Sequence, residues 1–163
     1  MGENPGIHRT KPVSYTHLKE FDKGEYLEQS SEVQAVIDYY GPVSFTLPTK
    51  ATGQTGEGEK PDFLKGPSPA DMLLGYDPAE DPARADTAGA LYYIDQSAPP
   101  YFIAHGTDDG IVSPANSEAL YNALEQNQVP AELYMIRDAG HADPRFYQTE
   151  MSDRILEFLD KVL

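Results

Sequence analysis

The 163-residue sequence contains no cysteine. Disulfide bonds, thiolate zinc sites and a cysteine nucleophile are therefore excluded. Long apolar runs are also missing: none approaches the about 20 residues that a membrane-spanning helix needs. The N-terminal stretch "MGENPGIHRT" lacks the apolar centre of a secretion signal. These absences assign no compartment to the chain.

Basic residues are scarce. Lysine and arginine together number 12 against 27 aspartates and glutamates, so the formal net charge is -15. Such a field repels a nucleic-acid backbone and an anionic membrane surface alike, and we expect neither as a partner. The length fits one domain, and a content of 39% hydrophobic and 24% charged residues is typical of a globular chain.

The first half of the chain is irregular. We interpret residues 1–19 as an unplaced N-terminal segment, either disordered or foreign to the rest of the chain. The run "VQAVIDYYGP" (33–42) predicts a buried strand that ends at a Gly-Pro turn. Residues 46–70 are rich in proline and glycine and predict a long surface excursion. A short helix is expected in 69–77, closing near Gly75, and an irregular path in 82–95.

The last third alternates between strand and helix patterns. "YFIAHG" (101–106) predicts a strand, and Ser113 followed by Pro114 predicts a helix start, with the helix running to about Asn127. "AELYMIR" (131–137) predicts the next strand. A closing amphipathic helix has apolar residues three and four positions apart, at Met151, Ile155, Phe158, Leu159 and Val162. This alternation predicts an α/β fold with a parallel sheet of at least three strands and flanking helices.

Polar residues directly follow both of these strands. Asp108 and Asp109 come after the first strand, and His141 comes after the second. Parallel neighbours lie about 4.8 Å apart and end at the same edge of the sheet, so these side chains can meet. A buried carboxylate that accepts the imidazole Nδ1 proton is the arrangement of a Ser/His/Asp hydrolase site.

The segment "HGTDDGIVSP", a helix and then "AGH" resemble the C-terminal half of the α/β-hydrolase fold. In that family the acid lies four positions after the histidine of His-Gly, which selects Asp109 over Asp108, and the base corresponds to His141. Ser113 stands where the family usually has proline. Residues 28–45 and 69–106 resemble the feruloyl-esterase-like and acetyl-esterase-like branch. Residues 20–163 are thus identified as the C-terminal portion of an α/β-hydrolase domain.

The resemblance implies a serine-type carboxylic-ester hydrolase. Its substrate would be a small-molecule or polysaccharide-linked ester, and neither a metal nor an organic cofactor is implied. The serine of a Gly-x-Ser-x-Gly motif is not found in these 163 residues, so we expect the isolated chain to be inactive. The alternative is a non-catalytic fragment or interaction module that retains the hydrolase scaffold. In that case the strand at 33–39 would expose an unpaired edge and favour self-association.

Other interpretations exist for the same polar residues. Asp109 could serve only to cap the turn "TDDG". His105, at the end of its strand, is expected to be structural, with its ring hydrogen-bonded beneath the loop that carries the acid. A metal site formed by His105, Asp108, Asp109, His141 and Asp143 is conceivable from residue type, but the spacing matches no metal-binding motif.

Overall fold

The computed structural model describes residues 25–26, 29–30, 32–47 and 68–163 of the chain. The predicted N-terminal segment 1–19, and most of the predicted excursion at 46–70, lie outside the described residues. In chain order the elements are β1 (Val36–Tyr39), α1 (Pro69–Leu74), α2 (Pro82–Asp86), η3 (Ala90–Tyr93), β2 (Tyr101–Gly106), α3 (Ala115–Gln126), β3 (Ala131–Ile136), η4 (Pro144–Tyr147) and α4 (Thr149–Val162). None of the described helices is long and apolar enough to cross a bilayer.

The three described strands form one parallel sheet in the order β1-β2-β3. In the central strand, Ile103 lies level with Asp38 of β1 and with Leu133 of β3. Every residue of β2 is buried, as is usual for a strand that is covered on both faces. The predicted parallel sheet of at least three strands is thereby confirmed.

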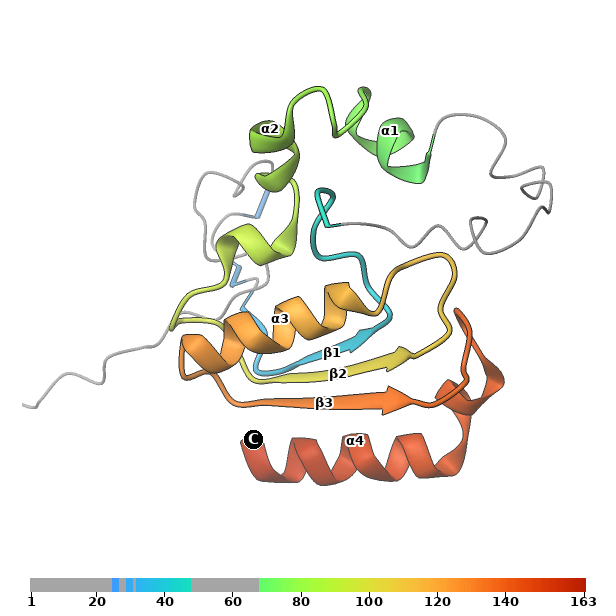
Figure 1. Cartoon of the computed structure of the whole chain (residues 1–163). Coiled ribbons are helices and arrows are strands. Elements are labelled where there is room, and N and C mark those ends of the chain that lie inside the picture. The colour runs from blue at the N-terminus through green and yellow to red at the C-terminus, as the bar shows by residue number, and fades with distance from the viewer. Residues whose placement is uncertain (1–24, 27–28, 31, 48–67) are drawn as a thin grey trace, which may run out of the picture.

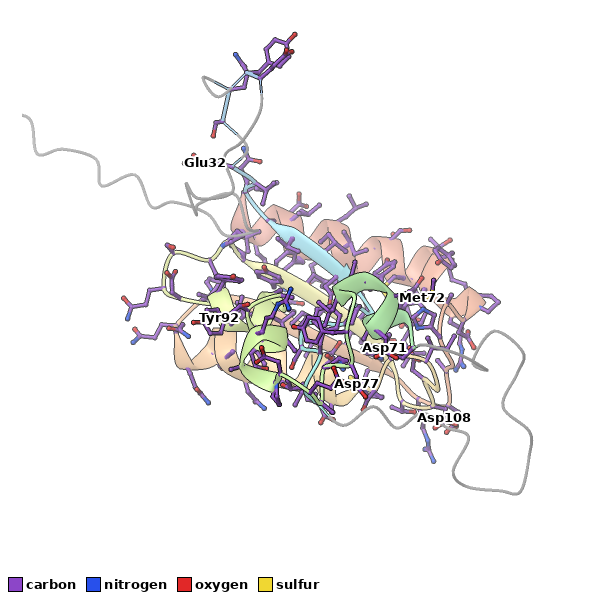
Figure 2. The ribbon with its side chains drawn as sticks, turned by 90° about the horizontal axis from the view of Figure 1, so that it is seen from above. Glu32, Asp71, Met72, Asp77, Tyr92 and Asp108 are labelled. Carbon is purple, nitrogen blue, oxygen red and sulfur yellow. The ribbon has the colours of Figure 1, made fainter. Side chains whose placement is uncertain are left out.

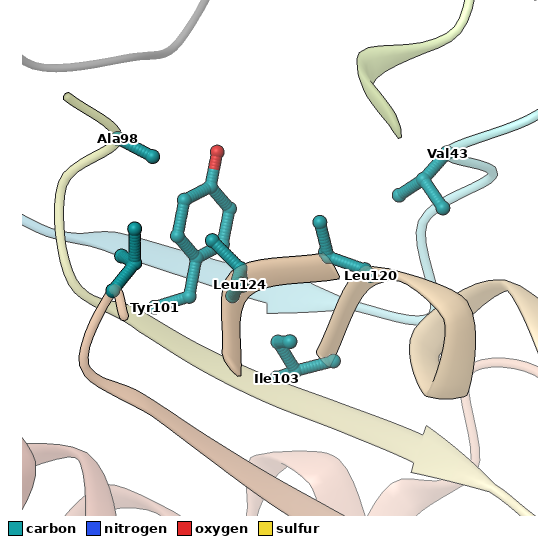
Figure 3. Packing of buried hydrophobic residues seen from close by; sticks show 7 residues of the cluster. Val43, Ala98, Tyr101, Ile103, Leu120 and Leu124 are labelled. Atoms are coloured by element: carbon teal, nitrogen blue, oxygen red, sulfur yellow. The ribbon is translucent and has the colours of Figure 1, made fainter. Parts of the chain in front are cut away.

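Helix α3 covers one face of the sheet and α4 covers the other (Figure 1). Side chains of β2 alternate between the two faces, because successive residues of a strand point in opposite directions. Figure 3 shows Tyr101 and Ile103 on the α3 side, packed near Leu120 and Leu124 of that helix. Val43, from the loop after β1, joins this cluster and brings that loop onto the α3 face.

The face under α4 has its own apolar cluster. Phe102 of β2 is buried there, with its ring centroid 5.8 Å from that of Phe158 on α4. The apolar positions predicted for the closing helix all face this cluster: two are buried and three are partly buried, namely Met151, Phe158, Ile155, Leu159 and Val162. The helix periodicity in the sequence therefore predicted the buried face of α4 correctly.

Two predictions need correction. Helix α3 begins at Ala115, and Pro114 is its N-cap, one residue later than expected. The reason is that the Ser113 carbonyl accepts from Asn116, three residues on, and the first four-residue bond is from Glu118 to Pro114. The region 82–95 is not simply irregular, because it contains α2, which Asp81 caps at its N-terminus, and the short helix η3.

The short helix predicted within 69–77 is present as α1. It ends at Gly75, which adopts the left-handed conformation with φ of 77°. Figure 2 shows Met72 of α1 and Tyr92 of η3, both exposed, on the side of the molecule that is seen from above. Neither α1 nor η3 is part of the sheet. The residues expected to carry the chemistry lie in the loops that follow β2 and β3.

Candidate active site

The loops that follow β2 and β3 lie against each other at the carboxyl edge of the sheet. The backbone N–H of Asp108 donates to the Ala139 carbonyl over 2.9 Å, and that of Asp138 donates to Thr107 Oγ1 over 2.8 Å. Gly106 makes this approach possible, because a side chain at its position would collide with the Ala139 carbonyl. The glycine of the His-Gly pair therefore brings the two loops together.

Asp109 and His141 are in direct contact across these loops. The distance from His141 Nδ1 to Asp109 Oδ2 is 2.8 Å. The Asp109 side chain is fully buried, whereas 26% of the His141 side chain remains accessible to solvent. The predicted adjacency of the two side chains is confirmed, and Nε2 of the imidazole has no hydrogen-bond partner among the described residues.

The two oxygens of the Asp109 carboxylate face different partners. Oδ1 accepts the backbone N–H groups of Ile111 and Val112 over 2.8 and 2.9 Å. Oδ2 faces His141 and also lies 3.2 Å from Nε2 of His105. Asp109 thus caps the turn and binds the histidine as well. Its neighbour Asp108 is exposed on the surface (Figure 2).

His105 is fully buried beneath the loop that carries Asp109. Its Nε2 faces two acceptors, the Val112 carbonyl at 3.0 Å and Asp109 Oδ2 at 3.2 Å, so this nitrogen carries the proton. Nδ1 then accepts the hydroxyl of Ser117, which is 2.6 Å away. The expected structural role of His105 is confirmed.

The sequence did not indicate what the first turn of α3 contributes. Ser117 reaches His105 as described, and its neighbour Asn116 is also buried. The Asn116 Oδ1 accepts the backbone N–H groups of Val43 and Ser44 over 3.1 and 3.2 Å. These two polar residues interrupt the apolar face expected of the helix, which is a signal that could have identified them.

Tyr40 is a second residue that sequence reasoning missed. Its ring centroid is 4.4 Å from that of His141, and its hydroxyl lies 2.7 Å from the hydroxyl of Tyr147 on η4. This hydrogen bond with Tyr147 is the main reason that the pKa of Tyr40 is raised to about 12. Tyr40 directly follows β1, so its position at the end of a third parallel strand could have placed it at the same edge as Asp109 and His141.

The loop that carries His141 is held in place by Arg145. Its guanidinium donates to the carbonyls of Arg137 and Asp138 over 2.7 and 2.8 Å, and to the carboxylate of Asp143 over 2.8 Å. These bonds to Arg145 lower the pKa of Asp143 to about 2. Asp138 and Ala142, on either side of His141, both adopt positive φ values, of 55° and 56°.

The five residues conceivable as metal ligands do not form one cluster. Asp143 binds Arg145, and Asp108 is exposed at the surface. Among the described residues, no group of three or more histidine, cysteine, aspartate or glutamate side chains is arranged to hold a metal ion.

The sequence model of the BD-FAE family matches residues 1–124, about three quarters of the chain. The chain belongs to the BD-FAE family. The match includes the N-terminal segment and Asp109, and it ends before His141. BD-FAE membership and the solved relatives together show that the chain has an α/β-hydrolase fold and belongs to a family of esterase or hydrolase type.

Solved structures support this assignment. A "truncated form of carbohydrate esterase from gut microbiota" matches with a TM-score of 0.67 and 25% identity, over 85% of this chain and 46% of that one. A "bifunctional GH43-CE" from Bacteroides eggerthii matches with a TM-score of 0.62 and 23% identity, over 86% of this chain and 18% of that one. The BD-FAE chain therefore spans less than half the length of these relatives.

A curated relative is the "non-reducing polyketide synthase mapC" of Penicillium roqueforti (strain FM164). It is 28% identical over 122 residues, which is 75% of this chain and 4% of that protein. The BD-FAE chain thus matches one small portion of a much longer polypeptide.

Proposed function

We propose that this chain supplies the acid–base pair of a serine-type carboxylic-ester hydrolase. His141 would act first as general base and then as general acid, and Asp109 would be its orienting carboxylate. The observation that carries the proposal is the 2.8 Å contact between His141 Nδ1 and Asp109 Oδ2, with Asp109 buried and His141 partly accessible. Membership of an esterase-type family supports it.

The chemistry requires one proton to move twice. Nε2 of His141 takes the proton of an attacking serine hydroxyl while Asp109 stabilises the resulting imidazolium through the Nδ1 proton. The serine oxygen bonds to the ester carbonyl carbon, and the departing alcohol receives the proton from Nε2. Water then hydrolyses the acyl-enzyme by the same route. Asp109 accepts no proton in this sequence; it fixes the tautomer of His141 and the orientation of its ring.

We further propose that the attacking serine comes from outside these 163 residues. No serine in the sequence stands in a Gly-x-Ser-x-Gly motif, and none of the described serines hydrogen-bonds to His141. The substrate would be a small-molecule or polysaccharide-linked ester, a class supported by the similarity to a carbohydrate esterase. On this proposal the isolated chain does not hydrolyse esters.

The pair can be tested in the isolated chain by the tautomer of His141. Nitrogen-15 NMR of neutral His141 should report a proton on Nδ1 and a bare Nε2. Asp109→Asn should move the proton to Nε2, because an amide NH₂ that faces Nδ1 donates instead of accepting. Asp108→Asn changes an exposed neighbouring carboxylate and serves as the matched control. An unchanged tautomer in Asp109→Asn would contradict the pairing.

The catalytic part of the proposal is tested by covalent labelling. The isolated chain should remain unlabelled by a fluorophosphonate probe and should not cleave p-nitrophenyl acetate. A chain extended upstream in its natural reading frame should be labelled at one serine, and Asp109→Asn should lower its kcat by about 10⁴-fold. Labelling of a serine within the 163 residues would overturn the external nucleophile. An extended chain without esterase activity would favour a non-catalytic scaffold.

A further inference from the structure

The turn at the end of β1 brings an aromatic ring against His141, and nothing in the proposed acid–base pair accounts for it. We infer that Tyr40 is a positioning residue that holds the His141 imidazole in the orientation from which Nε2 can exchange a proton. This inference rests on the proposed function for its chemical meaning. The placement of Tyr40 is argued independently, from the turn and from its contacts.

The turn is built around Asp38, Tyr40 and Gly41. The Asp38 carboxylate accepts a hydrogen bond from the backbone N–H of Gly41, and a side chain at Gly41 would collide with that carboxylate. Tyr40, between them, is held at a φ of 45°, in the left-handed region that non-glycine residues seldom adopt. Such conformations persist where surrounding contacts fix them, and they cluster at functional sites.

Three contacts fix the Tyr40 ring. Its hydroxyl pairs with that of Tyr147 over 2.7 Å, and its edge meets the buried ring of Phe146 at a centroid distance of 4.8 Å and an angle of 79°. The third contact is the imidazole of His141, at 4.4 Å and an angle of 59°. Two of these contacts come from η4, so Tyr40 joins the end of β1 to the segment that follows His141.

The contact between Tyr40 and His141 restricts the imidazole in a way that the Asp109 carboxylate alone cannot. A single hydrogen bond at Nδ1 leaves the imidazole free to rock about that bond, and movement of Nε2 by a fraction of an ångström is costly in catalysis. A ring packed against the imidazole restricts this motion without forming a hydrogen bond with either nitrogen. Asp109 therefore defines which nitrogen carries the proton, and Tyr40 limits where the other nitrogen can lie.

The inference can be tested in the isolated chain by exchange of the His141 Nδ1 proton with solvent, measured by NMR. Tyr40→Leu should accelerate this exchange by at least about tenfold, because the imidazole can then swing away from Asp109. Tyr40→Phe keeps the ring but loses the hydroxyl bond with Tyr147, so its rate should lie between those of the wild type and Tyr40→Leu. Tyr92→Leu, at an exposed tyrosine on η3, is the matched control. The signals of buried His105 should remain unchanged in every variant.

A second variant guards against loss of folding in Tyr40→Leu. Tyr147→Ala removes the hydroxyl partner from an exposed position on η4, together with a ring whose centroid lies 6.4 Å from that of Tyr39 on β1, and it should give an intermediate acceleration. Wild-type exchange rates in both Tyr40→Leu and Tyr147→Ala would overturn the role of Tyr40 while leaving the Asp109–His141 pair standing. A wild-type chain without a protected Nδ1 proton would overturn both the pair and this inference.

Discussion

Buried polar side chains at the site satisfy one another in a defined direction. The Ser117 hydroxyl donates to His105, whose Nε2–H faces Asp109, and Asp109 in turn holds His141. Each buried group in this series of contacts has a partner. This matters because a buried polar atom without a hydrogen bond lowers the stability of the fold by more than the bond itself would contribute. The buried His105 therefore links Ser117, on α3, to the carboxylate that binds His141.

The cost of removing that serine can be measured. Ser117→Ala leaves Nδ1 of buried His105 without a donor, so we expect the free energy of unfolding to fall by about 1–3 kcal/mol. Urea denaturation followed by circular dichroism measures this change. Ser152→Ala, on the exposed side of α4, should change the value by less than about 0.5 kcal/mol. Equal effects of the two substitutions would contradict the role of Ser117.

The positions of some single residues could be predicted from the sequence, and those of others could not. Asp109 and His141 were predictable because each follows a strand, and parallel topology brings the ends of neighbouring strands together. Ser117 and Tyr40 were not predicted. The contact of Ser117 with His105 depends on how α3 is rotated over the sheet. The contact of Tyr40 with His141 depends on a left-handed turn that no local sequence pattern indicates.

At the scale of elements, the loop after β3 contains both strained backbone conformations and charged side chains. Asp138 and Ala142 occupy left-handed conformations, each of which costs of order 1–3 kcal/mol in a non-glycine residue. Arg145 offsets this cost by hydrogen-bonding to two carbonyls of the loop and to Asp143. The partly accessible position of His141 therefore depends on a cation four residues further along the chain.

This support should weaken in acid. The pKa of Asp143 is lowered from 3.8 to about 2 in the folded chain, so its stabilising contribution is fully present above pH 3.8 and is lost as the pH falls toward 2. The protection of the amides of residues 137–143, taken relative to the intrinsic exchange rate at each pH, should fall across this window in the wild type. Arg145→Leu should show lower protection at all pH values and lack the additional fall between about pH 4 and 2.

The matched control for this experiment is Arg137→Leu. Arg137 is 91% exposed at its side chain and contacts only the neighbouring Asp138 at 3.6 Å among the described ion pairs. Its replacement should leave the acid-dependent exchange as it is in the wild type. A pH profile of Arg145→Leu that superimposes on the wild-type profile would show that Asp143 and Arg145 do not hold the loop.

Elements with a strong period were predictable from the sequence, whereas two of the short ones, α2 and η3, were not. The strand 101–106 and the buried face of α4 follow from continuous apolar runs and from spacings of three and four. Helix α2 and helix η3 have five and four residues, too few to establish a period. The formation of α2 depends on a local cap, the Asp81 side chain that accepts from the Arg84 N–H, whereas η3 has no side-chain cap.

At the scale of the whole molecule, β1 is an edge of the sheet within the described part of the chain. The N–H groups of Val36 and Tyr40 point toward β2, where they donate to the carbonyls of Pro100 and Ala104. Those of the alternate residues Ile37 and Tyr39 must therefore point away from the sheet. Backbone groups arranged in this way can pair with a strand from another molecule.

We propose that the chain self-associates through this edge when salt screens its net charge of -15. Sedimentation equilibrium should report an average mass that rises with protein concentration, more steeply in high salt. Ile37→Pro removes an outward N–H and should weaken the association, because proline is tolerated at an edge but cannot donate there. Ile37→Val keeps the donor and should behave as the wild type. Association that is insensitive to Ile37→Pro would exclude this edge.

The adjacent residues Asn116 and Ser117 have a consequence for how the chain tolerates changes in length. One residue inserted between Ser117 and Leu120 would rotate both side chains by about 100° relative to the apolar face of the helix, and would break their contacts with the loop after β1 and with His105 together. Residues added beyond Gln126, at the far end of α3, would leave that first turn unrotated. Insertions should therefore be tolerated at the C-terminal end of α3 and should destabilise the chain when they fall in its first turn.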